Sequence, residues 1–158
     1  VRCMPNTPAL VGKGATGLFA NEFVSREQKD LAKTLTDGVG ISIWVENEID
    51  IDTVTAVSGS GPAYYFLFME AMQETAAELG LSGDVAQRLI YQTALGAAAL
   101  AMQSTDSTAE LRRKVTSPNG TTEAAIKSFE ANQLKELVRK ALTAARDRSI
   151  ELAKESNN

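Results

Sequence analysis

The chain has 158 residues, of which 44% are hydrophobic and 23% charged, a composition typical of one folded domain with a core of its own. Its formal net charge of -4 argues against a nucleic-acid surface, and its longest uncharged stretches, residues 53–69 and 89–105, are too short and too polar for a membrane span. Histidine is absent, which excludes a Ser-His-Asp triad, a Cys-His dyad and a histidine-based zinc site, and we expect no metal site.

The N-terminal third of the chain predicts a short strand, helix, strand segment. Residues 1–4 have the pattern of a strand end, and residues 14–20 and 41–45 predict two more strands. Between these two strands, Ser25 and Gln28 have the spacing of a capping box at the start of a helix. Because the chain begins inside an element, we expect a further part of the protein upstream.

From Asp52 onward every strong periodicity is helical. Residues 63–79 are apolar around most of the helix circumference and predict a central, heavily buried helix. Residues 82–103 predict a second helix, in which the small side chains of residues 95–100 would let another helix approach closely. Three more helices are expected, from a capping box at Ser107 to about residue 115, over residues 121–131, and over a long final segment that includes Leu134 and Leu152. The pattern predicts a mainly α domain of about five helices.

Gly12, Gly14 and Gly17 match the Gly-x-Gly-x-x-Gly fingerprint of dinucleotide-binding domains, with Asp37 downstream. That fingerprint needs a strand before the first glycine and a helix opening after it, because the pyrophosphate rests on the helix N-terminus. Here two prolines precede the pattern, and the predicted strand over residues 14–20 runs through it. We therefore interpret the match as a coincidence.

The first segment with possible chemistry is Val57–Tyr64, just before the most apolar predicted helix. Pro62 suits a first-turn position and Ser60 a helix cap. Two interpretations of Gly59 and Gly61 remain open. They make either a flexible break at which two helices meet at an angle, or a place where the backbone comes close to a ligand.

The second segment is Thr116–Glu123, a predicted turn that leads into a helix N-terminus. Free backbone N–H groups and the positive end of the helix dipole favour a carboxylate there, and the two threonine hydroxyls add adjustable donors. The alternative is an ordinary turn with Thr121 as the N-cap. Local chemistry alone leaves both interpretations open.

Three segments, in this order and spacing, resemble the Δ1-pyrroline-5-carboxylate reductases: Arg2–Pro8, Val57–Tyr64 and Thr116–Thr122. The resemblance implies a mainly α fold, namely the helical dimerisation domain of the 6-phosphogluconate dehydrogenase-like reductases, behind a short αβ lead-in from a missing Rossmann domain. Residues 1–50 would be the remnant of that dinucleotide-binding domain. Residues 51–158 would form the helical dimerisation and substrate-binding domain.

The same resemblance implies the last step of proline biosynthesis, in which a hydride passes from NADPH or NADH to the C=N carbon of 1-pyrroline-5-carboxylate to give L-proline. Such chemistry suits a site without histidine, because the cofactor carries the difficult step. The missing domain would bind most of the cofactor, so this chain alone is expected to be inactive. It would supply substrate-binding and dimerisation surfaces.

Site residues follow from the resemblance as well. Thr122 is expected to be the main orienting hydroxyl, as the catalytic residue, with water supplying the final proton. The substrate pocket is expected to include Ser58, Gly59, Ser60, Gly61, Ser117, Pro118, Asn119, Gly120, Thr121 and Thr122. Asn6 and Thr7 would lie toward the nicotinamide of the cofactor.

Asn119 departs from the Ser-Pro-Gly-Gly-Thr-Thr pattern that these reductases commonly show, because it stands where the first glycine would be. Asparagine tolerates a left-handed backbone better than most residues with a side chain. We therefore expect the turn to keep its shape, while the affinity for substrate remains open.

The expected partners are the small-molecule substrate and a second copy of the chain, with no nucleic acid and no membrane. The final helix and residues 95–100 would carry a homodimer, and a higher oligomer remains open. Cys3 is the single cysteine, and no signal peptide is seen, so we expect a cytoplasmic protein.

Two alternatives remain: a helical dimerisation module without catalysis, and a related two-domain dehydrogenase acting on a hydroxy acid or ketoacid. The latter usually needs a basic side chain at the substrate carbon. This chain has no histidine, and Lys114 is the only lysine next to either segment. The sequence preceding Val1 would discriminate between them.

Overall fold

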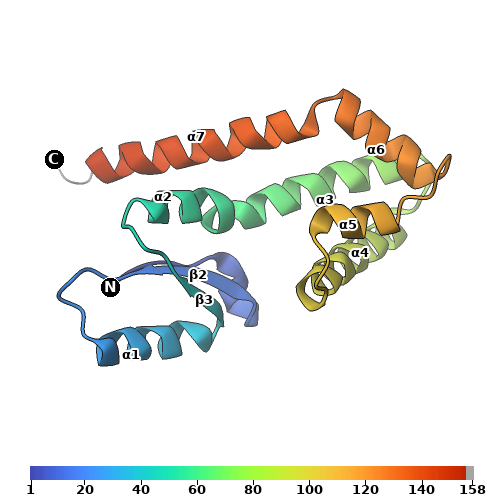
Figure 1. Ribbon diagram of the computed structural model, residues 1–158. Helices are drawn as coiled ribbons and strands as arrows, with labels where there is room; N and C mark the ends of the chain where they lie inside the picture. Colours follow the sequence, from blue (N-terminus) through green and yellow to red (C-terminus); the bar gives the residue numbers. More distant parts are fainter. Residues whose placement is uncertain (156–158) are drawn as a thin grey trace. The chain divides into compact units, whose positions relative to one another are not determined.

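The computed structural model describes residues 1–155, which are mostly helical and carry a small sheet near the N-terminus (Figure 1). In chain order the elements are β1 (Arg2–Met4), the 3-10 helix η1 (Thr7–Val11), β2 (Gly14–Phe19), α1 (Arg26–Asp37), β3 (Gly40–Trp44), α2 (Asp50–Val54), the π-helical turn η2 (Thr55–Gly59), α3 (Gly61–Glu78), α4 (Gly83–Gln103), α5 (Thr108–Lys114), α6 (Thr121–Ala131) and α7 (Leu134–Glu155). The predicted mainly α fold with an αβ lead-in is confirmed.

The chain forms two compact units. The first unit contains residues 1–65 together with the chain from residue 138 on, and the second unit contains residues 66–137. Along the described chain, no helix combines the length and the apolar character that a membrane span requires.

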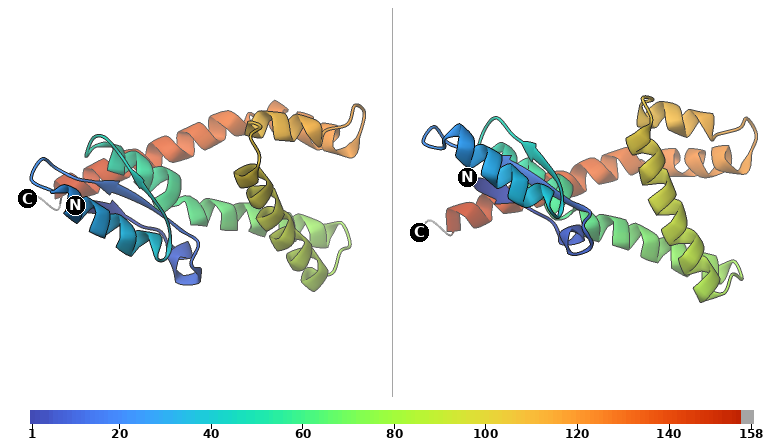
Figure 2. Two further views of the ribbon diagram at one scale, coloured as in Figure 1. Left: turned by 60° about the horizontal axis from the view of Figure 1, so that its bottom comes forward. Right: turned by 90° about the horizontal axis from the view of Figure 1, so that it is seen from below.

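A three-stranded sheet forms the centre of the first unit. β2 pairs antiparallel with β1 and parallel with β3, so the strand order is β1-β2-β3. Leu18 on the central strand is fully buried. Helix α1 covers one face of the sheet and α2 the other, and Figure 2 shows α1 running alongside the strands.

In the glycine pattern, Gly14 and Gly17 serve packing, whereas Gly12 serves a turn. Gly12 has a φ of 68° after η1, whereas Gly14 and Gly17 lie inside β2 with no helix opening after them. A Cβ atom at Gly17 would lie 2.6 Å from a methyl group of Val54, so this glycine lets α2 approach the sheet. The rejection of the dinucleotide fingerprint is confirmed.

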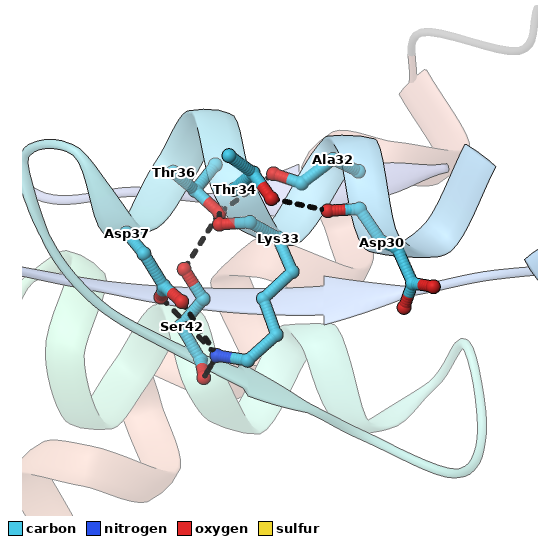
Figure 3. A network of polar contacts seen from close by, with 7 residues as sticks. All are labelled: Asp30, Ala32, Lys33, Thr34, Thr36, Asp37 and Ser42. Carbon is cyan, nitrogen blue, oxygen red and sulfur yellow. Dashed lines mark hydrogen bonds and ion pairs between the residues drawn. The ribbon is translucent and has the colours of Figure 1, made fainter. Parts of the chain in front are cut away.

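Helix α1 begins at the predicted capping box, in which Ser25 and Gln28 bond reciprocally. A polar network then attaches α1 to β3 (Figure 3). Lys33 Nζ donates to both carboxylate oxygens of Asp37, at 2.9 and 3.2 Å, and to the Ser42 carbonyl at 3.1 Å. The hydrogen bond from Lys33, followed by that from Ser42, lowers the pKa of the Asp37 carboxyl group.

Helix α2, η2 and α3 follow one another almost without interruption. Ser60 lies in the right-handed helical region, with φ -83° and ψ -16°, and its carbonyl accepts the Ala63 amide. A capping residue has an extended backbone, so the prediction that Ser60 caps the helix was wrong. Pro62 does lie in the first turn of α3, as predicted.

Asp52, a residue that is only 7% exposed, attaches α7 to α2 through its carboxylate inside the first unit. Its Oδ1 accepts a hydrogen bond from Ser149 Oγ at 2.7 Å. Ile51, the neighbour of Asp52, is fully buried. Ile51 therefore anchors α2 by burial of its side chain, and Asp52 anchors it by the hydrogen bond from Ser149.

In the second unit, most apolar side chains are exposed. Ala86 and Ile90 of α4 are buried, and the Phe68 and Phe129 rings lie 6.2 Å apart. Leu67 is 66% exposed, so the prediction of a heavily buried helix over residues 63–79 was wrong for this chain by itself. Periodicity identifies an apolar helix, but it does not show whether the same chain covers it.

Candidate functional site

The first predicted segment, Val57–Tyr64, belongs to the first unit and begins inside the turn η2. The backbone of this turn is π-helical, because the Ser60 amide donates to the carbonyl of Thr55, five residues earlier, at 2.8 Å. The Ser58 hydroxyl donates to the Val54 carbonyl at 3.1 Å. Since this bond uses its hydrogen, the Ser58 oxygen can only accept a further hydrogen bond. Single π-helical turns inside helices are frequent at functional sites.

Asn6 contacts this turn directly. Its Nδ2 donates to the Ser58 carbonyl at 3.0 Å, and its Oδ1 accepts the Ala15 amide at 2.9 Å. Thr7, the next residue, is exposed at the start of η1. The structure thus brings Asn6 and Ser58 together from positions 52 residues apart.

A cleft of about 410 Å³ lies within the first unit, between the sheet and the run of α2 and η2. It is lined by Ala15, Thr16, Gly17, Ile43, Val45, Asp50, Thr53, Val54, Val57 and Ser58. Most of this lining is apolar, and of the predicted substrate residues only Ser58 belongs to it.

The second segment forms a tight turn in the second unit. Asn119 has a φ of 59°, so the expectation that asparagine adopts the left-handed conformation there is confirmed. The Gly120 amide donates to the Ser117 carbonyl at 3.0 Å, which closes the turn. The Asn119 amide donates to Glu123 Oε2 at 2.8 Å, and Lys127 Nζ lies 3.2 Å from the other oxygen of Glu123. The bond from the Asn119 amide, followed by that from Lys127, lowers the pKa of the Glu123 carboxyl group.

Helix α6 starts without a side-chain cap. Gly120, and not Thr121, is the N-cap, and no side chain bonds to the first turn. Within the described residues, the amides of Thr121, Thr122 and Glu123 have no backbone acceptor. The side chains of Thr121 and Thr122 are exposed. This helix end therefore presents free N–H groups beside two hydroxyls, which is an arrangement that suits a carboxylate.

The predicted site residues fall into two clusters, one in each unit. Asn6, Thr7 and Ser58–Gly61 belong to the first unit, and Ser117–Thr122 to the second. The hydrogen bond between Asn6 and Ser58 was not predicted. The sequence signal that points to it is Pro62, which stands four residues after Ser58 and has no N–H to offer the Ser58 carbonyl.

Tyr64 at the end of the first segment has a second unpredicted feature. Its hydroxyl is the one buried side-chain polar atom without a hydrogen-bond partner among the described residues. For metals, the described part of the chain gathers no group of three or more Cys, Asp or Glu side chains that could hold an ion.

Comparisons with known proteins agree on one family. Residues 48–152 match the family described as pyrroline-5-carboxylate reductase dimerisation. Among curated proteins, the pyrroline-5-carboxylate reductase of Pseudomonas aeruginosa is 60% identical over 155 residues, which are 98% of this chain and 57% of that protein. The reductase of Pasteurella multocida is 45% identical over 98% of this chain and 56% of its own length.

Solved structures give the same result. A pyrroline-5-carboxylate reductase from Coxiella burnetii has a TM-score of 0.93 and 55% identity, over 96% of this chain and 56% of that one. The Plasmodium falciparum pyrroline carboxylate reductase with NADP bound has a TM-score of 0.87 and 34% identity, over 93% of this chain and 60% of that one. This chain spans a little over half the length of these relatives. With the helical fold and both loop segments matched, the chain belongs to the pyrroline-5-carboxylate reductase family, through its dimerisation domain.

Proposed function

We propose that this chain is the substrate-binding and dimerisation part of an NAD(P)H-dependent pyrroline-5-carboxylate reductase, which reduces 1-pyrroline-5-carboxylate to L-proline. The observation that carries the proposal is the 60% identity to the Pseudomonas aeruginosa relative over 98% of this chain. The domain division stays part of the proposal, with residues 1–50 as the end of a dinucleotide-binding domain and residues 51–158 as the helical domain.

In this proposal the amino end of α6 binds the substrate carboxylate. The amides of Thr121 and Thr122 have no backbone acceptor within the described residues, and the helix dipole adds a favourable field for an anion. The Thr122 hydroxyl donates to the ring nitrogen and orients the C=N bond. Ser117, Pro118, Asn119 and Gly120 shape the turn that presents these groups. The Glu123 carboxylate, which would repel the substrate, is held by the Asn119 amide and by Lys127.

We propose that Ser58–Gly61 of the first unit also contact the substrate. When bound, NADPH or NADH supplies the hydride that adds to the C=N carbon, and water gives the ring nitrogen its proton. The chain itself binds and orients the substrate. It needs no general base in this scheme, which agrees with the absence of histidine from the sequence.

The residues present fit the cofactor only in part. Gly12, Gly14 and Gly17 do not stand between a strand and a helix, so they cannot hold a pyrophosphate in the usual way. Thr7 has an exposed hydroxyl for the nicotinamide side, while Asn6 has one amide hydrogen left after its two bonds inside the chain. We propose that the part of the relatives beyond this chain holds the rest of the dinucleotide.

The proposed partner is a second copy of the chain, in agreement with a family that is described by dimerisation. Exposed apolar side chains on α3 and α4, among them Phe66, Leu67, Leu89 and Leu95, suit such an interface. Higher assemblies formed from these dimers, and a cytoplasmic location, belong to the same proposal.

A chimera tests the activity. This chain would replace the 155 matched residues of the Pseudomonas aeruginosa relative, and NADPH oxidation would be measured with and without 1-pyrroline-5-carboxylate. We expect turnover comparable with that of the unaltered relative, and none from the 158-residue chain alone. A folded chimera without turnover, beside an active relative, would reject the reductase and favour the non-catalytic dimerisation module. Turnover of a hydroxy acid or ketoacid instead would favour the other dehydrogenase.

Thr122→Ala in the chimera tests the site. Removing one oriented donor should lower kcat/KM for the substrate at least about tenfold. Thr108→Ala is the matched control, because Thr108 is an exposed threonine in the first turn of α5 in the same unit. Equal kinetics for Thr122→Ala and the control would reject the assignment of Thr122.

A further inference from the structure

The carbonyl of Ser58 has lost its usual helical partner. In an α-helix it would accept the amide of the residue four positions later, which here is Pro62 and has no N–H. The amide of the fifth residue, Ala63, is already bonded to the Ser60 carbonyl. A half-buried carbonyl without a donor is unfavourable, and Asn6 Nδ2 supplies the donor from 52 residues away.

Asn6 bonds to Ser58 instead of capping its own helix, η1. It occupies the N-cap position of η1, where asparagine ordinarily accepts an amide of its own helix, yet its side chain makes no such bond. Instead Oδ1 accepts the Ala15 amide at the start of β2. One side chain therefore joins three elements: η1, β2 and the π-helical turn η2.

We propose that Asn6 is a positioning residue of the substrate site, which fixes the η2 turn and Ser58 through the Ser58 carbonyl, and that its amide does not act by binding cofactor. The inference rests on the proposed function, because the turn in question carries the proposed substrate residues Ser58–Gly61.

Two observations support this role. The oxygen of the Asn6 amide and one of its hydrogens are used inside the chain, which leaves little of the group for a ligand. The same turn is also confined from β1, since a Cβ atom at Gly59 would lie 3.3 Å from the Met4 sulfur. A turn held from two sides is preorganised. A change that loosens it should therefore weaken the binding of substrate more than the binding of cofactor.

Kinetics of the chimera separate the two roles. We expect Asn6→Asp, which loses the part-buried bond to Ser58, to raise KM for 1-pyrroline-5-carboxylate about tenfold, and Asn6→Ala, which loses both bonds, to raise it at least as much. Both variants should leave KM for NADPH within about twofold. Thr7→Ala is the matched control, because Thr7 is the exposed neighbour that we propose to lie toward the nicotinamide, and its loss should change KM for NADPH instead. A rise in KM for NADPH with an unchanged KM for substrate in the Asn6 variants would overturn the inference.

Amide hydrogen exchange in the 158-residue chain gives a readout that needs no activity. The Ala15 amide should be protected in the unaltered chain and in Asn6→Asp, which keeps the acceptor, but should exchange faster in Asn6→Ala. One of the two Asn6 Nδ2 hydrogens should also exchange slowly in the unaltered chain. This measurement needs no variant, so it remains valid if a variant does not fold. Fast exchange of the Ala15 amide hydrogen and of both Asn6 Nδ2 hydrogens in the unaltered chain would contradict the two hydrogen bonds of Asn6. An inactive chimera with slow exchange would reject the proposed function only.

Discussion

The two compact units differ in where their apolar side chains lie. The first unit encloses Leu18 and Ile51 completely, and polar side chains join its elements at Asp52. The second unit leaves Leu67, Leu95 and Met102 largely exposed, and only Ala86 and Ile90 of α4 are buried in it. Exposed apolar surface on this scale marks an interaction site. The first unit exposes apolar side chains too, among them Leu10 at 90% and Leu35 at 68%, so the difference lies in the core. Only the first unit encloses large apolar side chains completely.

The largest expected effect comes from the core of the first unit. Leu18→Ala should lower the free energy of unfolding by about 2–5 kcal/mol, because it leaves a cavity in a fully buried place. Chemical denaturation of the chain would measure the change. Leu18→Met, which roughly conserves volume, is the control and should cost less than about 1.5 kcal/mol. Equal costs for the two variants would contradict a close-packed core around β2.

Leu67→Asp should weaken the association of two chains into the proposed homodimer. A carboxylate placed in the proposed apolar interface on α3 should raise the dissociation constant of the proposed homodimer at least about 100-fold, or ~2.7 kcal/mol. Analytical ultracentrifugation over a concentration series would measure it. Leu35→Asp on α1 in the first unit is the matched control, since Leu35 and Leu67 are 68% and 66% exposed. If both variants dissociate the dimer equally, the interface is not specific to the second unit.

The link between Asp52 and Ser149 should have a smaller effect. Ser149→Ala removes the donor to a buried carboxylate and should cost about 1–3 kcal/mol of unfolding free energy. Thermal unfolding would measure this change, and Ser149→Thr, which keeps the hydroxyl, should recover most of it. If Ser149→Ala unfolds at the same temperature as the unaltered chain, α7 is held to α2 by other contacts.

Local sequence patterns predicted the elements well. The capping boxes at Ser25 and Ser107 start helices as expected, and the strands and helices have nearly the predicted bounds. The left-handed backbone at Asn119 also followed from the residue type. Each of these features depends on neighbours within a few residues, which is the range over which propensity and capping act.

Sequence patterns missed one distant contact and one local feature. The bond from Asn6 to Ser58 joins segments 52 residues apart, and Pro62 alone hints at it. The π-helical turn is local, but no periodicity distinguishes it from an α-helix. Ser60 has the residue type and position of a helix cap, but helical backbone precedes it. The burial of α3 could not be predicted either, because it depends on which surface covers the helix.

The smallest expected effect is a change in the pKa of one carboxyl group in each unit. Asp37 has its pKa lowered chiefly by a side chain, Lys33, whereas Glu123 has its pKa lowered chiefly by a backbone amide, that of Asn119. Lys33→Met should therefore return the pKa of Asp37 most of the way to its ordinary value. Lys127→Met should leave most of the depression at Glu123. Carbon-13 titration of the two carboxyl groups would measure both changes.

The sign of the accompanying stability change follows from the direction of the shifts. A carboxyl group whose pKa is lower in the folded state stabilises the fold above its unfolded pKa, and this contribution is lost as the pH falls through the folded value. Acidification should therefore release the Asn119 turn as Glu123 takes up a proton, and Lys127→Met should change that transition little. If the pKa of Asp37 in Lys33→Met and the pKa of Glu123 in Lys127→Met rise equally, side chains determine the pKa of both carboxyl groups. The Asn119 turn would then depend on the Lys127 ammonium group and would lack the support that the Asn119 amide gives.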